Sequence, residues 1–357
     1  MASAFPIHCR SSCACLSSAN DHCPKAPMKL NRRNLLRLAC ATTAARIAAP
    51  ALAQQSSTRI VVGFPAGGPV DIAARFIAPL LAERLSARFE VENLPGDSGN
   101  AATGGVVTAQ ADGRTLLLCG PVNTINTTLF PRLPFRFESD LAPIASLYRV
   151  PLVVEVHPGV PVHSAAELLA YARSRPGELR VGYAGKGTPQ HVGIELFKFM
   201  AGVDLSLVPY LGSAPALEDL VAGRIEVMFD PLPSSIGHIS AGRLRALAVT
   251  GTKRIDRIAS VPLMSDTVPG YEAGSWFGLC APRSTSATTI DTLNAACNAA
   301  LSQPATLRRL DDLGGSAMTT TPAEFAAFIR DETEKYARVI ARSGIALASG
   351  SQPPHAR

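Results

Sequence analysis

Short apolar runs rich in β-branched residues alternate along the chain with longer segments in which apolar residues recur every three or four positions. The run 59–64 is followed by Ile72, Phe76 and Leu80 at helical spacing, which predicts a strand, a glycine-rich turn and a helix. The same order repeats along the chain, and repeated strand–helix units favour parallel sheets covered by helices. We therefore predict the α/β class, with strands at 59–64, 89–92, 115–119, 152–156, 180–184, 205–210, 225–229, 244–250 and 277–281, and helices after residue 68 and over 188–200, 214–221, 288–302 and 322–343.

The length and charge of the chain narrow the possible functions. With 357 residues, of which 47% are hydrophobic and 17% charged, the chain can form about two domains with buried cores. Its net charge of +6 arises within residues 1–53, which contain seven basic residues and one acid, so that 27 basic and 27 acidic residues follow. This balance gives no electrostatic reason to expect a nucleic-acid partner.

Residues 28–53 have the layout of an export signal, in which a basic start precedes an Ala-rich apolar segment. The small residues Ala51 and Ala53 predict cleavage after Ala53 and location in the periplasm. The Arg32-Arg33 pair before Asn34-Leu35-Leu36 favours the twin-arginine route, with an ordinary secretory signal as the alternative.

Three cysteines follow the predicted cleavage point, namely Cys119, Cys280 and Cys297. Cys119 and Cys280 each end an apolar run, which predicts buried thiols, and a disulfide between them stays open because the periplasm is oxidising. The sequence has no His or Cys set with zinc-ligand spacing and no phosphate-loop, dinucleotide or nucleophile-elbow motif. We therefore expect neither a metal nor another cofactor.

Two glycine loops carry the candidate chemistry, and each follows a predicted strand. In parallel sheets such loops lie at the carboxyl ends of the strands, where helix N-termini present free N–H groups to anions. Each loop is therefore predicted to hold a carboxylate, with plain turn formation as the alternative. The residues concerned are Phe64, Pro65, Ala66, Gly67, Gly68 and Asp71 in the first loop, and Gly185, Lys186, Gly187, Thr188 and His191 in the second.

Three ionisable residues near these loops have two interpretations each. His191, at a predicted helix start, can hydrogen-bond a ligand or cap and pack its helix. Asp71 can interact with the helix dipole or brace the glycine loop, and Asp230, directly after a strand, can fix the next loop or face a cleft. A periplasmic enzyme that acts on a small carboxylate, with His191 as base and Asp71 or Asp230 as its orienting group, is therefore the alternative to a binding protein.

A series of ordered motifs spans the chain beyond the predicted signal. It comprises Val62-Gly63-Phe64-Pro65-Ala66-Gly67-Gly68 with Asp71, Glu92-Asn93-Leu94-Pro95-Gly96, Asp112-Gly113-Arg114-Thr115-Leu116-Leu117, the loop from Ala184 to His191, Val208-Pro209-Tyr210-Leu211-Gly212-Ser213-Ala214-Pro215-Ala216, Phe229-Asp230, Leu244-Arg245-Ala246-Leu247-Ala248-Val249-Thr250 and Trp276-Phe277-Gly278. In their order and number these motifs resemble those of the Bug receptors, the periplasmic solute-binding proteins of tripartite tricarboxylate transporters.

The resemblance implies a two-lobed periplasmic binding protein fold of type II, with two parallel-rich sheets flanked by helices and a ligand cleft between the lobes. Lobe 1 would comprise 54–152 and 276–345, and lobe 2 would comprise 153–275. We interpret 1–27 as a non-native N-terminal extension and 346–357 as a tail. The implied function is capture of a small carboxylate without catalysis, for a tripartite membrane permease or a sensor kinase, and we expect a monomer.

The resemblance also implies which residues bind the ligand, by matching positions. Lys186 and the Asn123-Thr124 segment depart from the family pattern. Lys186 is either solvated or faces the cleft, and in the second case it would favour dicarboxylates over monocarboxylates. The implied residues are Phe64, Gly67, Gly68 and Asp71 from lobe 1, Gly185, Gly187, Thr188 and His191 from lobe 2, then Tyr210, Gly212, Ser213 and Asp230, and last Asn123 and Thr124.

Overall fold

The computed structural model describes residues 57–343 and residue 345. The predicted extension at 1–27, the signal at 28–53 with its cleavage point, and the tail at 346–357 lie outside these residues. Within the described range, no helix is long and apolar enough to cross a membrane.

The strands of the described residues belong to one continuous sheet. They are β1 (Thr58–Val62), β2 (Phe89–Asn93), β3 (Thr115–Cys119), β4 (Leu141–Val156), β5 (Arg180–Tyr183), β6 (Ser206–Pro209), β7 (Val227–Pro231), β8 (Arg245–Val249), β9 (Gly274–Pro282) and β10 (Ser316–Ala317). Their order is β2-β1-β3-β9-β4-β7-β5-β6, and β8 and β10 pair with β4. The β1, β2, β3 group and the β5, β6, β7 group are parallel, whereas the pairs made by β4 and β9 are antiparallel. The predicted α/β class is confirmed.

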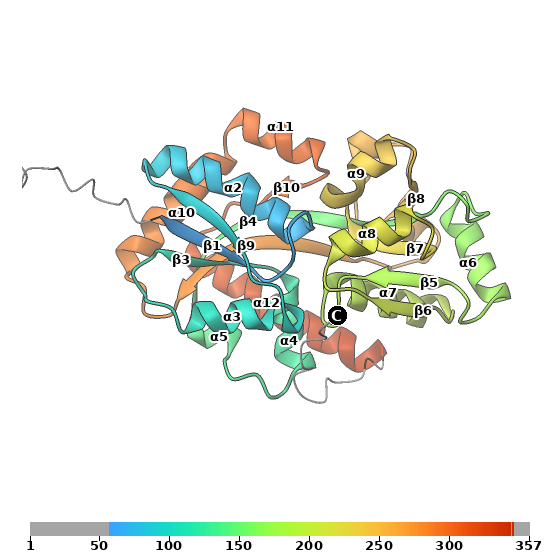
Figure 1. Cartoon of the computed structure of the whole chain (residues 1–357), viewed down its shortest axis with the longest axis horizontal. Helices are drawn as coiled ribbons and strands as arrows, with labels where there is room; N and C mark the ends of the chain where they lie inside the picture. The colour runs from blue at the N-terminus through green and yellow to red at the C-terminus, as the bar shows by residue number, and fades with distance from the viewer. Residues whose placement is uncertain (1–56, 344, 346–357) are drawn as a thin grey trace, which may run out of the picture. The chain divides into compact units, whose positions relative to one another are not determined.

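Helices lie between the strands and cover the sheet on both faces (Figure 1). They are α2 (Pro69–Leu85), α3 (Asn100–Val107), α4 (Pro121–Leu129), α5 (Phe137–Asp140), α6 (Ala165–Ser174), α7 (Pro189–Ala201), α8 (Ser213–Val221), α9 (Leu232–Ser240), α10 (Ala287–Leu301), α11 (Pro304–Asp312) and α12 (Pro322–Ser343), with short 3-10 turns at η1 (Asp97–Gly99), η2 (Asp256–Ile258) and η3 (Met264–Asp266).

The two long strands β4 and β9 connect two lobes, one built on β1–β3 and the other on β5–β7 (Figure 1). The segment Leu141–Pro151 of β4 pairs with β9, and Leu152–Val156 pairs with β7 and β8. The sequence predicted only 152–156 of this strand, because Pro143 and polar residues interrupt the apolar pattern before it. Pairing with β9 over that stretch outweighs the weak local strand preference.

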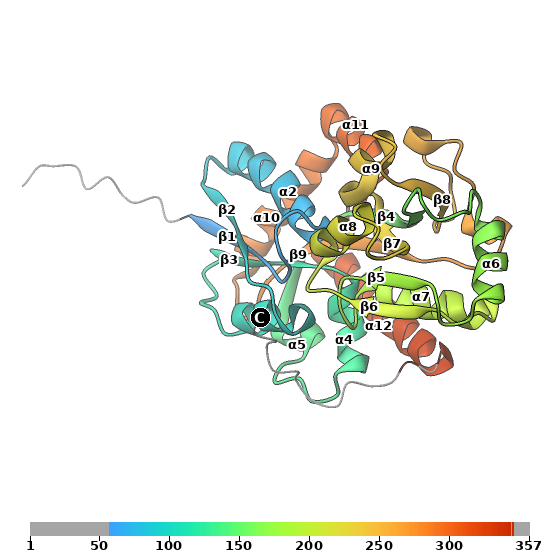
Figure 2. The same ribbon diagram turned by 45° about the vertical axis from the view of Figure 1, so that its right-hand side comes forward.

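Consecutive strand residues point to opposite faces, so the first lobe has a core on each side of the sheet. Ile60 of β1 packs in the same core as Phe76 of α2, and the next residue, Val61, packs in the same core as Phe325 of α12. Figure 2 shows the same arrangement, with α2 and α10 on one face of β1 and β3 and α3 on the other. Each fully buried side chain of this size stabilises the fold by about 2 kcal/mol.

The second lobe is built in the same way. Val181 of β5 and Phe229 of β7 pack with Phe197 of α7 on one face. Met228, the neighbour of Phe229, packs with Leu217 of α8 on the opposite face. The parallel strands of both lobes are therefore sandwiched between helices, which brings their carboxyl ends toward the space between the lobes.

The helices predicted at 188–200, 214–221, 288–302 and 322–343 are confirmed to within two residues as α7, α8, α10 and α12. Ser164 caps α6 by accepting a hydrogen bond from the Glu167 N–H at 3.1 Å, as its Ser-x-x-Glu pattern predicts. Helix α2 runs through Pro79 as one element of 17 residues. Helices α4 and α9 were not predicted, since each begins beside a proline in a stretch poor in strong helix formers. Helix α11 was not predicted either, although it contains Ala, Leu and Arg, because it is short and its Pro304 follows closely on the end of α10.

The predicted burial of Cys119 and Cys280 is confirmed, and both are free thiols. Their Sγ atoms lie 3.3 Å apart between β3 and β9. Burial, together with the neighbouring Cys280 thiol, raises the pKa of Cys119 well above its usual value, so this thiol stays protonated at neutral pH.

Candidate ligand-binding cleft

The starts of five helices, α2, α4, α7, α8 and α9, line one cavity between the two lobes. Three of these helices begin with proline, which fixes the first turn, and the backbone N–H group of the residue after each proline, Val70, Val122 or Gln190, has no partner in its own helix. These N–H groups carry the positive ends of the helix dipoles, so their convergence creates a site for a negatively charged group. The residues at these starts that line the cavity are Gly68, Pro69 and Val70, Gly120, Pro121, Val122 and Asn123, Thr188, Pro189 and Gln190, Ser213, and Pro231.

The rest of the cavity wall is mainly apolar. Phe64, Leu117, Leu118 and Phe277 come from the first lobe and the connecting strand β9, and Ala184 comes from the second lobe. None of the described residues that line the cavity is a Lys, Arg, His, Asp or Glu. The centre of a water molecule can occupy about 40 Å³ of the cavity.

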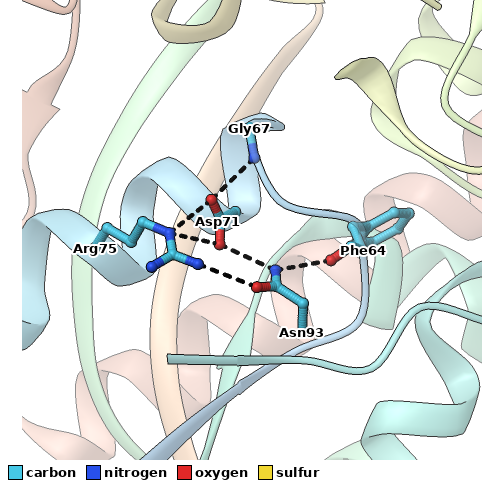
Figure 3. A network of polar contacts seen from close by, with 5 residues as sticks. All are labelled: Phe64, Gly67, Asp71, Arg75 and Asn93. Carbon is cyan, nitrogen blue, oxygen red and sulfur yellow. Dashed lines mark hydrogen bonds and ion pairs between the residues drawn. The ribbon is translucent and has the colours of Figure 1, made fainter. Parts of the chain in front are cut away.

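Asp71 braces the first glycine loop from behind (Figure 3). Its carboxylate accepts hydrogen bonds from the Gly67 N–H at 2.9 Å, from Arg75 Nε at 2.9 Å and from Asn93 Nδ2 at 2.9 Å. Asn93 Nδ2 also donates to the Phe64 carbonyl at 3.0 Å, which ties both ends of the loop to one network. Burial alone would raise the pKa of Asp71, but these hydrogen bonds outweigh it and hold the pKa below its usual value.

Thr188 and His191 order the second glycine loop. Thr188 Oγ1 donates to the Gly185 carbonyl at 2.7 Å and accepts from the His191 N–H at 3.4 Å, so that it caps α7. His191 Nδ1 accepts from the Gly187 N–H at 3.4 Å, and its ring stacks on Tyr183 with centroids 5.1 Å apart. Burial, with smaller effects of Lys186 and Lys198, lowers the pKa of His191 to about 4, and the imidazole is neutral at pH 7.

The lowered pKa of His191 predicts a loss of stability in acid. The pKa falls from 6.5 to about 4 on folding, so the unfolded chain takes up the proton first as the pH falls, and stability is lost between about pH 6.5 and pH 4. Between pH 8 and pH 5 the parent protein should lose on the order of 2 kcal/mol that His191→Asn does not lose. Urea unfolding at both pH values measures this difference. His163→Asn, at an exposed histidine, is the control, and equal pH dependence in the parent and His191→Asn would contradict the prediction.

Asp230 lies fully buried near the end of β7 and joins three helix starts. Its Oδ1 accepts hydrogen bonds from Ser213 Oγ of α8 at 2.6 Å and from Gln190 Nε2 of α7 at 3.0 Å, and its Oδ2 accepts one from Ser234 Oγ of α9. Burial raises the pKa of Asp230 to about 6, against the opposing effect of the hydrogen bonds. The carboxyl group thus fixes the relative positions of α7, α8 and α9 behind the cavity wall.

The two lobes touch at the rim of the cavity. A Cβ atom on Gly212 of the second lobe would lie 2.9 Å from Pro65 Cδ of the first. Gly187 has φ +81°, and a Cβ atom there would overlap Asn126 Oδ1 of α4. The cleft is therefore closed in this structure, and at Gly187 and Gly212 the lobes approach too closely to leave room for a side chain.

Comparison with known proteins assigns the chain to a family. Residues 73–345 match the family described as tripartite tricarboxylate transporter family receptor. The chain belongs to this receptor family. The resemblance to Bug receptors is confirmed by BugT of Bordetella pertussis, which is 33% identical over 310 residues, covering 85% of this chain and 95% of BugT.

Solved structures of similar receptors have the same two-lobed fold. A protein from R. palustris, solved with adipate, is 36% identical and has a TM-score of 0.79, with 81% of this chain and 98% of that chain covered. MatC from Rhodopseudomonas palustris, solved with bound malate, is 30% identical and has a TM-score of 0.75, with 80% of this chain and 98% of that chain covered. The predicted periplasmic binding protein fold is therefore confirmed for this receptor.

The structure of the receptor divides the residues predicted as ligand-binding into three groups. One group lines the cavity, a second forms the two loops and the contact at its rim, and a third lies behind the wall in hydrogen-bond networks. The first group is Phe64, Gly68, Asn123, Thr188 and Ser213; the second is Pro65, Ala66, Gly67, Gly185, Lys186, Gly187, Tyr210 and Gly212; and the third is Asp71, Thr124, His191 and Asp230.

The sequence of the receptor does not show that several of its apolar residues line the cavity. Leu117 and Leu118 belong to an apolar strand, and the position of Phe277 in the sequence fits core packing of the connecting strand slightly better than a pocket wall. The start of α4 carried a usable signal, because Gly120-Pro121-Val122 repeats the Gly68-Pro69-Val70 pattern that begins α2. That repeat would have added Gly120, Pro121 and Val122 to Asn123 and Thr124, which the predicted site already contained.

Proposed function

We propose that the protein is an extracytoplasmic receptor that captures a small organic carboxylate by closure of its two lobes and releases it unchanged. The observation that carries this proposal is the convergence of five helix starts on one closed cavity whose described lining residues have no charged side chains. Backbone N–H groups there can replace the hydration shell of a carboxylate. The adipate and malate in the two similar R. palustris structures support a ligand of this class.

The rival function, an enzyme with His191 as base, has little support from the geometry. The His191 ring lies outside the residues that line the cavity and has a pKa of about 4, so it would be a weak base at neutral pH. The carboxylates of Asp71 and Asp230 are both engaged in hydrogen bonds behind the wall. We therefore propose binding without catalysis.

We further propose how the receptor is organised and where it acts. Lobe 1 comprises 54–152 and 276–345, and lobe 2 comprises 153–275. The segment 28–53 directs export to the periplasm, by the twin-arginine route that Arg32-Arg33 favours, with cleavage after Ala53. There the receptor acts as a monomer that delivers its ligand to a tripartite membrane permease or to a sensor kinase.

Thermal unfolding with a panel of carboxylic acids tests the proposed function. Malate, adipate and shorter acids are compared with their methyl esters, which keep the carbon skeleton but lack the negative charge. An acid present at 100 times its Kd should stabilise the protein by about 2.7 kcal/mol and raise Tm by several degrees. Esters should have no effect. Failure of every acid in the panel to raise Tm would contradict the proposal.

A further inference from the structure

A second carboxyl group is buried near Asp230, behind the wall of the cleft. Glu155 of β4 has no exposed surface, and neither of its carboxyl oxygens has a hydrogen-bond partner among the described residues. In protein interiors the large majority of polar side-chain atoms have such a partner. Because an unpartnered buried charge is very costly, the burial of Glu155 favours a neutral carboxyl group.

The register of the sheet places Glu155 beside Asp230. Val153 of β4 pairs with Asp230 of β7, and Glu155 pairs with Met228. Cross-strand partners share a face of the sheet, and residues two apart on a strand point the same way, so Glu155 and Asp230 are diagonal neighbours on one face. Such neighbours lie about 7 to 8 Å apart, which is within reach of a long side chain. The two carboxyl groups therefore share one buried region of the second lobe.

Helix α9 contributes two consecutive serines to this region. Ser234 Oγ donates to Asp230, whereas Ser235 Oγ is buried and has no hydrogen-bond partner among the described residues. Burial, and then the negative charge of Asp230, raise the pKa of Glu155 well above its usual value, against a smaller opposing effect of the Ser235 hydroxyl. The surroundings of Glu155 thus agree with its lack of partners in favouring the protonated form.

No cation among the described residues compensates for an ionised Glu155. Arg245 of β8 donates instead to backbone carbonyls of the segment 160–162, at 3.2 and 2.9 Å. His238 of α9 is neutral at and above pH 7, because burial and Arg243 lower its pKa. The other charged side chains on the elements packed against this face are exposed or form an ion pair at the surface, namely Glu218, Asp219, Asp256 and Arg257.

The charge of Glu155 is connected to the ligand cavity through Asp230. Asp230 accepts hydrogen bonds from Gln190 of α7, Ser213 of α8 and Ser234 of α9, and the starts of these helices line the cavity. An ionised Glu155 would repel Asp230 in surroundings that screen charges much less than water does. The repulsion would displace Asp230 and the three helix starts that it holds.

We propose that Glu155 is a positioning residue for ligand capture, which maintains the geometry of the cavity only while its carboxyl group is protonated. The inference rests on the proposed carboxylate-binding function and adds a residue that acts on it through Asp230. Ligand affinity should therefore fall as the pH rises above neutrality. A carboxylic acid ligand is fully ionised throughout this range, so its own titration does not contribute.

Isothermal titration at pH 7 and pH 9.5, with the acid that raises Tm most in the carboxylate panel, tests the inference. Glu155→Gln keeps the size of the side chain and is neutral at both pH values. The affinity of the parent protein should fall at least about fivefold between pH 7 and pH 9.5, and that of Glu155→Gln should change by less than about twofold. Glu178→Gln, at an exposed position, is the control and should follow the parent protein. Equal pH dependence in the parent protein and Glu155→Gln would overturn the inference.

Infrared difference spectroscopy at pH 7 tests the protonation of Glu155 without a ligand. The C=O stretch of a protonated carboxyl group should appear in the difference between the parent protein and Glu155→Gln, and its absence would also overturn the inference. Failure of every acid in the panel to bind, with this band present, would instead contradict the proposed function, and the inference with it.

Discussion

Gly187→Ala is expected to weaken ligand binding by about 100-fold while the protein stays folded, which corresponds to a loss of about 2.7 kcal/mol of binding free energy. A Cβ atom at this position would overlap Asn126 Oδ1 across the cleft. Asn126 cannot move aside easily, because it is buried and its Nδ2 donates to the Ser98 carbonyl at 3.1 Å and to Asn100 Oδ1 at 3.0 Å. The added methyl group should therefore hold the two lobes apart and disfavour the closed, ligand-bound state.

Gly202→Ala is the matched control for this variant. Gly202 also has a positive φ, +61°, but a Cβ atom there would have no neighbour within 4 Å. Both variants should lose about 1 kcal/mol of stability through backbone strain, and only Gly187→Ala should lose affinity. Titration with the acid that raises Tm most in the carboxylate panel measures the affinities, and urea unfolding measures the stabilities. Equal affinities in the two variants would show that the Gly187 contact does not govern closure.

Asp230→Ala should destabilise the protein by about 3 kcal/mol, because it leaves the Ser213, Gln190 and Ser234 donors without their shared acceptor in a buried site. Ligand affinity should fall as well, since the starts of α7, α8 and α9 lose their common anchor. Urea unfolding at pH 7 measures the loss of stability. Asp331→Ala, at an exposed position on α12, is the control and should change stability by less than about 0.5 kcal/mol. A loss no greater in Asp230→Ala than in this control would contradict the anchoring role.

Asp230→Asn adds a test of the charge at this position. The pKa of Asp230 rises from 3.8 to about 6 on folding, so the folded state holds the proton more tightly between these values. The contribution of this group to stability is therefore full below about pH 4 and is lost as the pH rises through 6. On acidification from pH 7 to pH 4 the parent protein should gain stability relative to Asp230→Asn, opposite in sign to the effect of His191. A relative loss would contradict the assigned burial of this carboxyl group.

The fold was largely predictable because its elements carry strong local patterns. The second glycine loop, with Thr188 and Pro189, predicts both the end of β5 and the first turn of α7. The length of β4 was not predictable, because Pro143 and Arg149 become strand residues only through pairing with β9. The strand propensity of a short segment does not depend on such long-range pairing and so cannot predict it.

The site was predictable in its loops but less so in its wall. Periodicity identifies Leu117 and Leu118 as buried residues, but an apolar side chain covered by a ligand and one covered by a helix follow the same pattern. Glu155 is a charged residue type whose burial the sequence pattern does not predict: it lies in the apolar run 152–156 and is fully buried. Burial and the nearby Asp230 raise its pKa well above the usual value, which favours a neutral carboxyl group that the sequence pattern does not reveal.

Native mass spectrometry of the receptor purified from the periplasm, followed by denaturation to identify any released small molecule, tests the carboxylate-receptor function most directly. We predict one small organic acid per chain, released with its mass unchanged. A protein that carries no acid, and whose Tm is not raised by any member of the carboxylate panel, would contradict this function.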